Sequence, residues 1–358
     1  MPFWDILCQL NAIDDCCVQI SKRHLTNEVQ ENTSVDDELA ERDSDEMSRT
    51  CQQIVDSEPI YSIALSPDGV DLLAGGYGGL SLHDASNGDL IQRFDVTGGR
   101  LIVAYAPDGH YVASRDYDQG VMVFDPASSS PLARLESARS PANIAFTGDS
   151  NALLVVDDSD RKKVSRWSFL TGEVVPLGYG FNGEVLFLSL SADGRVLVAS
   201  DDANRNLAFG MPDGNPYAHV DFPRGGGSMT AAAFSLVGGI HVLCGYERGG
   251  VGLGEVVEQS YGPPRPQFTH TLPHSTAVVG ERVYGVAFSP NADLFAVRYH
   301  SRVELWRRSA STPPSLVESY EGMGSADVVA RKTLIFAADG KSMITAGYQG
   351  IYRCVIDL

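Results

Sequence analysis

Short runs of alternating apolar and polar residues recur along most of the chain, separated by turn-forming residues. Alternation with a period of two is typical of strands that bury one face. In the first unit these runs cover residues 61–65, 72–75, 80–84 and 90–94. The Asn-Gly and Asp-Gly pairs between runs supply the positive φ that tight hairpins require. The pattern therefore predicts four-stranded antiparallel units and an all-β fold.

A turn sequence of the Ser-Pro-Asp-Gly type follows the first run of each unit. Its copies begin at Ser66, Ala106, Thr147, Ser191, Ser235, Ser289 and Ala337. The steps between copies are 40, 41, 44, 44, 54 and 48 residues, close to the roughly 40–50 residues of one propeller blade. Small residues recur in the first runs, as expected where seven strands crowd around an axis: Ala64, Ala104, Ala145, Ala233 and Ala287. Seven copies predict a seven-bladed β-propeller.

The two ends of the repeat array are complementary. A strand-like segment at 51–56 precedes the first unit, whereas the seventh unit stops after its third strand, at 350–356. An open ring would leave strand edges exposed to aggregation. We therefore expect the N-terminal strand to complete the last blade and close the ring.

Residues 1–49 differ from the propeller, which we assign to 50–358. Apolar residues at Phe3, Ile6, Leu10, Ile13, Cys17 and Ile20 have the spacing of an amphipathic helix within residues 3–24. Such a short helix is marginal alone in water, so it is expected to dock, either on its own propeller or on a partner. The segment 28–46 carries nine acids against Arg42 alone, which predicts a disordered acidic linker.

The repeats resemble those of the WD-repeat propeller family. The resemblance covers residues 50–358 and is carried by the first-strand signatures at 63–69 and 286–290 and by the third-strand endings at 82–84, 123–125 and 305–307. No Gly-His dipeptide occurs and no unit ends in Trp-Asp, so the family's buried Asp-His-Ser/Thr-Trp network has no counterpart here. The resemblance implies an interaction platform of a divergent, WD-repeat-like type.

Charge and composition limit the partners. A formal net charge of −19 disfavours nucleic acid and anionic membrane surfaces, because both require a basic face. The six cysteines form no CxxC or Cys/His cluster, so neither a zinc site nor a disulfide framework is indicated. The chain start lacks the features of a signal peptide, and no apolar run reaches the length of a transmembrane helix. These features predict a cytoplasmic protein, with a nuclear location also open, and no cofactor.

The second strand of each unit ends at one equivalent position, on the face where the loops between blades also emerge. Alignment of the units places Tyr77, Tyr117, Tyr246, Tyr299 and Tyr348 there, with Asp158 and Asp202 in the other two blades. Tyrosine combines a large apolar ring with a hydroxyl, which suits a protein- or peptide-binding surface. Near the same turns lie Arg115, Arg205, Arg248 and Arg298. The competing interpretation is that the rings fill the space between blades.

The chain shows no GxSxG motif, and its glycine-rich segments open no helix that could bind phosphate. The enzyme alternative is a hydrolase resembling the seven-bladed lactonases, with a carboxylate or metal site at the channel mouth. Its candidate cation ligands are Asp157, Asp158, Asp201 and Asp202, which are otherwise explained as solvated hairpin acids. In the irregular stretch 259–282, Pro273 separates His270 from His274, which argues against a helical zinc pair. The sequence thus favours a non-catalytic scaffold for a protein or peptide partner.

Overall fold

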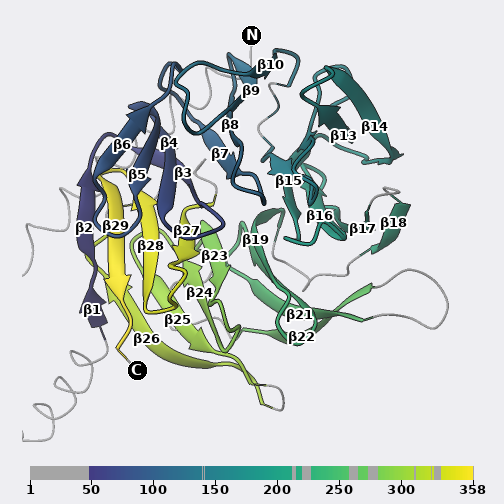
Figure 1. Ribbon diagram of the computed structural model, residues 1–358. Helices are drawn as coiled ribbons and strands as arrows, with labels where there is room; N and C mark the ends of the chain where they lie inside the picture. Colours follow the sequence, from purple (N-terminus) through teal and green to yellow (C-terminus); the bar gives the residue numbers. More distant parts are fainter. Residues whose placement is uncertain are drawn as a thin grey trace, which may run out of the picture. The chain divides into compact units, whose positions relative to one another are not determined.

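The computed structural model describes residues 48–357, except 139, 141, 212–214, 220–226, 258–264, 273–280, 310–311, 324 and 326–331. The expected N-terminal helix and acidic linker, and His274, lie outside the described residues. Every regular element in the described part is a β-strand. The strands form seven sheets arranged as blades around a central axis (Figure 1). The predicted all-β seven-bladed propeller is confirmed.

Each of the first five blades is a four-stranded sheet whose strands follow one another along the chain. Blade one consists of β3 (Ile60–Leu65), β4 (Asp71–Gly76), β5 (Gly79–Asp84) and β6 (Leu90–Arg93). Blade two consists of β7 (Ile102–Tyr105), β8 (Val112–Asp116), β9 (Gly120–Phe124) and β10 (Ala133–Leu135). Blade three consists of β11 (Ala145–Phe146), β12 (Leu153–Val155), β13 (Lys163–Ser168) and β14 (Glu173–Gly180). Blade four consists of β15 (Val185–Leu190), β16 (Val196–Asp201), β17 (Asn206–Gly210) and β18 (Asn215–His219). Blade five consists of β19 (Met229–Ser235), β20 (Ile240–Tyr246), β21 (Val251–Val257) and β22 (Arg265–Thr271).

The last two blades take in strands from the start of the propeller. Blade six consists of β23 (Gly285–Phe288), β24 (Leu294–Arg298), β25 (Val303–Arg307) and β26 (Ser315–Glu321), with β1 (Ser48–Thr50) added at its outer edge. Blade seven consists of β27 (Leu334–Phe336), β28 (Ser342–Gly347) and β29 (Gly350–Val355), with β2 (Gln52–Asp56) as its outer strand.

The repeated turn sequence has one structural role in all seven units. In the first copy, Ser66 Oγ donates to Asp68 Oδ1 at 2.6 Å and accepts the Asp71 backbone N–H at 2.8 Å. The fourth residue of every copy has a positive φ: Gly69 78°, Gly109 79°, Ser150 59°, Gly194 71°, Gly238 72°, Ala292 59° and Gly340 68°. Positive φ is inexpensive for glycine and costly for other residues. The turn therefore explains why glycine recurs and confirms the division of the chain into seven units.

The ring closes where the first strands meet the last. β2 pairs antiparallel with β29, with Gln52 opposite Arg353 and Asp56 opposite Gly350. The added strand β1 pairs parallel with β26, with Ser48 opposite Ser319. The sequence predicts the first pairing but not the second, because β1 is three residues long and has no alternating pattern. Residues 48–56 thus join two neighbouring blades.

A disulfide bond crosses this closure, linking Cys51 to Cys354. The expectation that the cysteines form no disulfide is wrong for this pair. The two residues are 303 positions apart in the sequence, and only the ring closure makes them neighbours, so local spacing carries no signal. Disulfides persist mainly in oxidising compartments, so the cysteine spacing no longer supports the predicted cytoplasmic location.

The hydrophobic core lies between adjacent sheets. One cluster joins Ile102 and Val121 of blade two to Leu153 and Trp167 of blade three, all buried. Each blade therefore packs through apolar faces on its neighbours, which leaves loop ends and the inner strands bordering the axis as the surfaces for function. No described segment forms a helix able to span a bilayer.

Candidate interaction surface and central channel

The hairpins between the second and third strands make the same kind of backbone hydrogen bond in five of the blades. In each, the first residue of the hairpin donates its N–H to a carbonyl of the loop that enters the same blade. The five bonds are Tyr77 to Pro59 at 3.1 Å, Asp158 to Ser137 at 2.6 Å, Asp202 to Glu184 at 3.0 Å, Glu247 to Ser228 at 3.0 Å and Tyr348 to Ser325 at 2.9 Å. This contact identifies equivalent positions independently of the sequence alignment. It also ties the hairpins and the entering loops into one surface.

Tyrosine is the first residue of the hairpin on three consecutive blades, and the backbone contact is described for two of them, Tyr77 and Tyr348. Tyr348, Tyr77 and Tyr117 belong to blades seven, one and two, and they are 46%, 48% and 55% exposed. The ring of Tyr77 contacts that of the buried Tyr61 edge-on, at 5.4 Å between centroids. A Cβ on Gly98 would lie 1.6 Å from the Tyr77 carbonyl oxygen, so the loop entering blade two packs directly on this hairpin. We call Tyr348, Tyr77 and Tyr117 the tyrosine arc.

Two of the five predicted tyrosines do not belong to the arc. Tyr246 and Tyr299 are 1% and 5% exposed. Tyr246 is still the last residue of β20, and Glu247 makes the backbone contact that Tyr77 makes in blade one. The backbone N–H of Tyr299 likewise bonds to the Arg302 carbonyl, within its own hairpin, at 2.9 Å. The sequence alignment is thus one residue off in these blades, and a shift of one residue turns a side chain to the other face.

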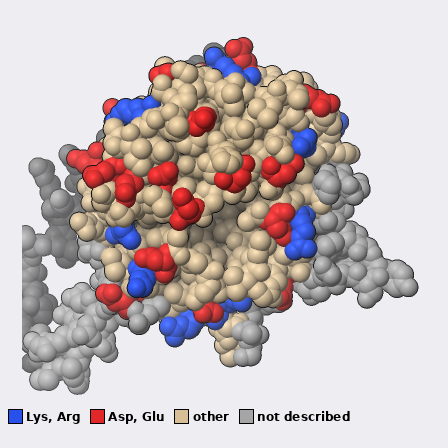
Figure 2. Space-filling model, in the orientation of Figure 1, with Lys and Arg blue, Asp and Glu red and all other residues tan. Residues whose placement is uncertain are grey.

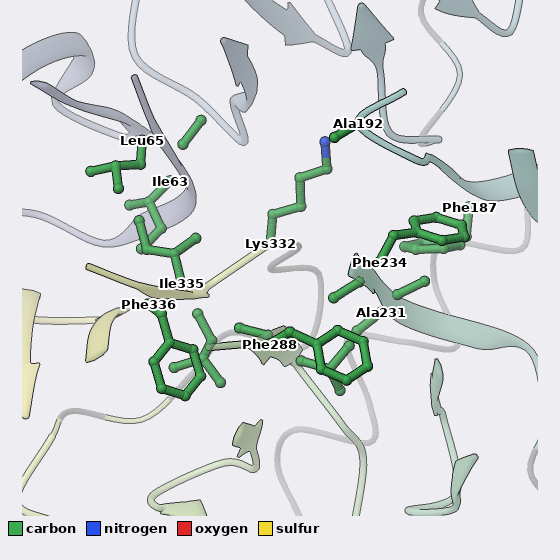
Figure 3. A pocket seen from close by; sticks show the side chains of 17 residues that line it. Ile63, Leu65, Phe187, Ala192, Ala231, Phe234, Phe288, Lys332, Ile335 and Phe336 are labelled. Atoms are coloured by element: carbon green, nitrogen blue, oxygen red, sulfur yellow. The ribbon is translucent and has the colours of Figure 1, made fainter. Parts of the chain in front are cut away.

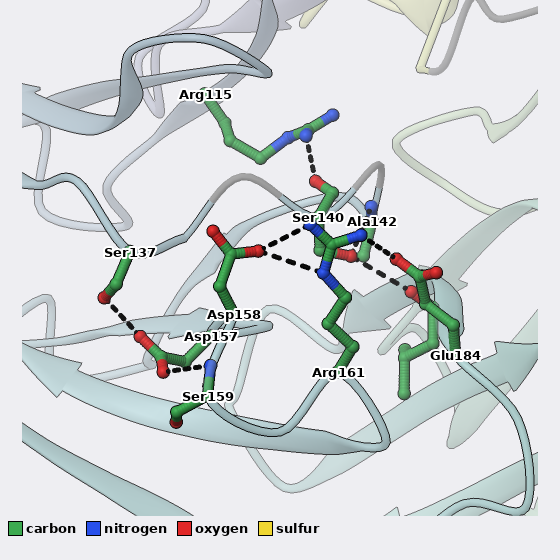
Figure 4. A network of polar contacts seen from close by, with 10 residues as sticks. Arg115, Ser137, Ser140, Ala142, Asp157, Asp158, Ser159, Arg161 and Glu184 are labelled. Atoms are coloured by element: carbon green, nitrogen blue, oxygen red, sulfur yellow. Dashed lines mark hydrogen bonds and ion pairs between the residues drawn. The ribbon is translucent and has the colours of Figure 1, made fainter. Parts of the chain in front are cut away.

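The hairpin of blade three carries charged groups that pair with one another (Figure 4). Arg161 lies between Asp158 and Glu184, with Nη2 at 2.8 Å from Asp158 Oδ1 and Nη1 at 3.1 Å from Glu184 Oε1. Partial burial opposes the charge of Arg161, but hydrogen bonds to Asp158 and Tyr117 and the charges of Glu184 and Asp158 raise its pKa. The network connects Tyr117, the end of the tyrosine arc, to the entry of blade four.

The predicted arginines have different environments. Arg248 is exposed on the hairpin of blade five, and Arg205 is half-buried. Arg115 and Arg298 are buried, and burial lowers the pKa of Arg115 to about 10 and that of Arg298 to about 9. Arg115 donates through Nη1 to the Ser140 carbonyl (Figure 4). Arg115 and Arg298 therefore support blade packing, and their guanidinium groups are not available on the surface.

The tandem aspartates act as turn residues. Asp157 accepts bonds from Ser137 Oγ and from the Ser159 backbone N–H. Asp201 accepts from the backbone N–H groups of Gly183 at 3.1 Å and Arg205 at 2.8 Å. Within the described ranges, no three or more His, Cys, Asp or Glu side chains are grouped so that they could hold a metal ion.

The central channel contains two cavities that share four lining residues, Ala64, Leu65, Ala192 and Lys332 (Figure 3). The larger, about 580 Å³, borders the inner strands of blades one and four to seven, and the smaller, about 470 Å³, borders those of blades one to four. All five alanines predicted to crowd the axis line these cavities: Ala64, Ala104, Ala145, Ala233 and Ala287. The Lys332 Nζ crosses from blade seven to donate to the Ile144 carbonyl, at the entry of blade three, at 3.2 Å. Sequence analysis missed this residue, because a single lysine before an inner strand resembles an ordinary loop residue.

Acidic side chains are prominent on one face of the described surface. Figure 2 shows Asp and Glu side chains spread around a hollow near the middle of one face, with fewer Lys and Arg. This distribution agrees with the net charge of −19 for the whole chain. Long-range electrostatics therefore favour neutral or cationic partners over polyanions.

Comparison with known proteins shows the fold. No protein-family model and no curated protein matches the chain. Among solved structures, the Cps50 (Swd1) β-propeller domain of Myceliophteria thermophila has a TM-score of 0.69 at 13% identity, covering 85% of this chain and 98% of that one. Hydrazine synthase of Kuenenia stuttgartiensis has a TM-score of 0.66 at 15% identity, covering 84% of this chain and 97% of that one. The likeness shows the fold alone, a β-propeller over about 85% of the chain, whose seven blades are described above.

Proposed function

We propose that this propeller is a non-catalytic scaffold that binds a protein or peptide partner through the tyrosine arc. The observation that carries the proposal is the exposure of Tyr348, Tyr77 and Tyr117 at one equivalent position on three consecutive blades. Exposed aromatic side chains grouped on one face are typical of interaction sites.

The hairpin backbone supports the arc. Tyr77 and Tyr348 sit in two-residue loops, between the pairs Gly76–Gly79 and Gly347–Gly350. Their hairpins are also bonded to neighbouring loops through the backbone contacts described above. A rigid surface loses little conformational entropy on binding, so the hairpins present the tyrosine rings on a preorganised backbone.

Charge indicates the chemistry of the partner. The ion-paired groups of blades three and four flank the arc at Tyr117, and the molecule as a whole is strongly acidic. A segment with apolar or aromatic side chains next to basic residues fits both features, since opposite charge accelerates association.

Mutation of the arc tests the proposal. The variant Y77A/Y117A/Y348A is expected to lose capture of the partner that the wild type retains in affinity purification, while its melting temperature stays within a few degrees. The matched control is V70A/L236A/V237A, which removes exposed apolar side chains from turns at the opposite ends of the strands. Equal partner capture by the arc variant and the wild type would contradict the proposal, as would equal loss of capture in the control variant.

The enzyme alternative is the lactonase-like hydrolase with a carboxylate or metal site at the channel mouth. The likeness to hydrazine synthase concerns the fold alone and adds no support for catalysis. The described carboxylates near the hairpins bind backbone N–H groups or Arg161 and do not converge on one point. Stabilisation of the protein by one of calcium, magnesium, manganese or zinc in a thermal-shift series would favour this alternative over the scaffold.

A further inference from the structure

The central channel combines an apolar lining with one charged group. The larger cavity is bordered by Phe234, Phe288 and Phe336 together with small alanines, and the smaller by Phe146, Leu190 and alanines. Among the described lining residues, Lys332 is the only one with a full charge, and Tyr105 is the other titratable one. Cavities of about 580 and 470 Å³ are in the range that holds small molecules.

Lys332 occupies its position at a cost. Burial of an ammonium group disfavours its charged form and lowers the pKa of Lys332 to about 8. The backbone of Lys332 also has a φ of 51°, a conformation that is unfavourable for residues other than glycine. Uncommon conformations of this kind are concentrated at binding sites.

The contacts of Lys332 leave its charge without a counterion in the described part of the channel. Its Nζ has one described acceptor, the Ile144 carbonyl, whereas an ammonium group has three N–H donors. Burial is the one cause that lowers the pKa of Lys332, with no contribution from a neighbouring charge. A buried cation is stabilised best by an ion pair, and the described residues of the site supply no anion.

We propose that the central channel binds a small organic monocarboxylate, with its carboxylate paired to Lys332 Nζ and its apolar body packed against Phe234, Phe288 and Phe336. Ligands with several negative charges do not fit, because the described lining offers one ammonium group and the protein carries a net charge of −19. The apolar lining adds to the affinity, since burial of apolar surface is favourable. This site is separate from the tyrosine arc and does not depend on it.

Isothermal titration with the full-length protein tests the site with three probes of equal chain length: octanoate, 1-octanol and octylammonium. Octanoate is expected to bind at least about tenfold more tightly than the alcohol, and octylammonium more weakly than both. In K332M, octanoate should lose about tenfold in affinity while 1-octanol binds as before, and K332R should retain octanoate binding. In A233L, which fills the larger cavity, both octanoate and 1-octanol should bind more weakly.

Two results would overturn the proposal: equal binding of octanoate and octylammonium to the wild type, or unchanged octanoate affinity in K332M. If the variants do not fold, protection of the wild-type protein from acetylation provides a second test. Octanoate should protect Lys332 from acetylation, measured by mass spectrometry, whereas the exposed Lys341 of a surface turn should be acetylated at the same rate with and without ligand. Absence of protection at saturating octanoate would also refute the site.

Discussion

The disulfide between Cys51 and Cys354 should contribute strongly to the stability of the ring. The bond closes a loop of 303 residues, and the loop-entropy relation gives an upper limit of about 5–6 kcal/mol for a loop of this length. β2 already holds the two ends together by pairing with β29, and measured disulfides contribute about 2–4 kcal/mol. We therefore expect the variant C51S/C354S to lose about 3 kcal/mol in free energy of unfolding.

For a domain of this size the loss corresponds to a decrease of roughly 5 °C in melting temperature, measurable by differential scanning calorimetry. Dithiothreitol should lower the melting temperature of the wild type to that of C51S/C354S and leave the variant unchanged, which is the matched control. Peptide mapping without reduction should recover a fragment in which Cys51 is linked to Cys354. Recovery of both as free thiols, or a melting temperature of the wild type that does not respond to reductant, would refute the reasoning.

Two further predictions concern Lys332 and the closing strand. Because the folded-state pKa of Lys332 is about 8 against 10.5 in the unfolded chain, the charged lysine destabilises the fold below pH 8; K332M should raise the free energy of unfolding by up to about 3 kcal/mol at pH 7. The gain should shrink as the pH rises from 8 to 10.5, and a gain that does not depend on pH would contradict the burial of the charge. Deletion of residues 1–47 should leave the melting temperature nearly unchanged, whereas deletion of 1–56 should lower it by at least about 10 °C, because it removes β1, β2 and the disulfide; calorimetry showing equal stability of the two truncations would contradict closure by β2.

The fold could be predicted from the sequence because each blade repeats the same local chemistry. The Ser-Pro-Asp-Gly turn fixes a positive φ at its fourth position, and even the degenerate copies ending at Ser150 and Ala292 keep that conformation. The alternating strands on either side bury one face between blades. Local propensity and packing agree, so the pattern determines both the number of units and their boundaries.

The candidate surface could be predicted only in part, because its geometry depends on hairpin length. The hairpin loop is two residues long after Gly76 and Gly347, but in blade five the ladder extends to Tyr246, with Gly245 opposite Val251. The second strand of blade five is therefore one residue longer at this end, so Tyr246 is buried within the strand and Glu247 is exposed as the first residue of the hairpin. The disulfide and the Lys332 contact join residues 303 and 188 positions apart, and sequence patterns within one unit carry no information about such pairs.

Closure by the first strands also determines the order of assembly during synthesis. β1 and β2 are made before any blade, yet their partners β26 and β29 end at Glu321 and Val355. At about 5–20 residues per second, the ribosome needs roughly 15–60 s to make the intervening chain. Residues 48–56 must therefore wait, without these partners, until blades six and seven have been made. A chaperone that shields this segment on the nascent chain would prevent misassembly during that interval.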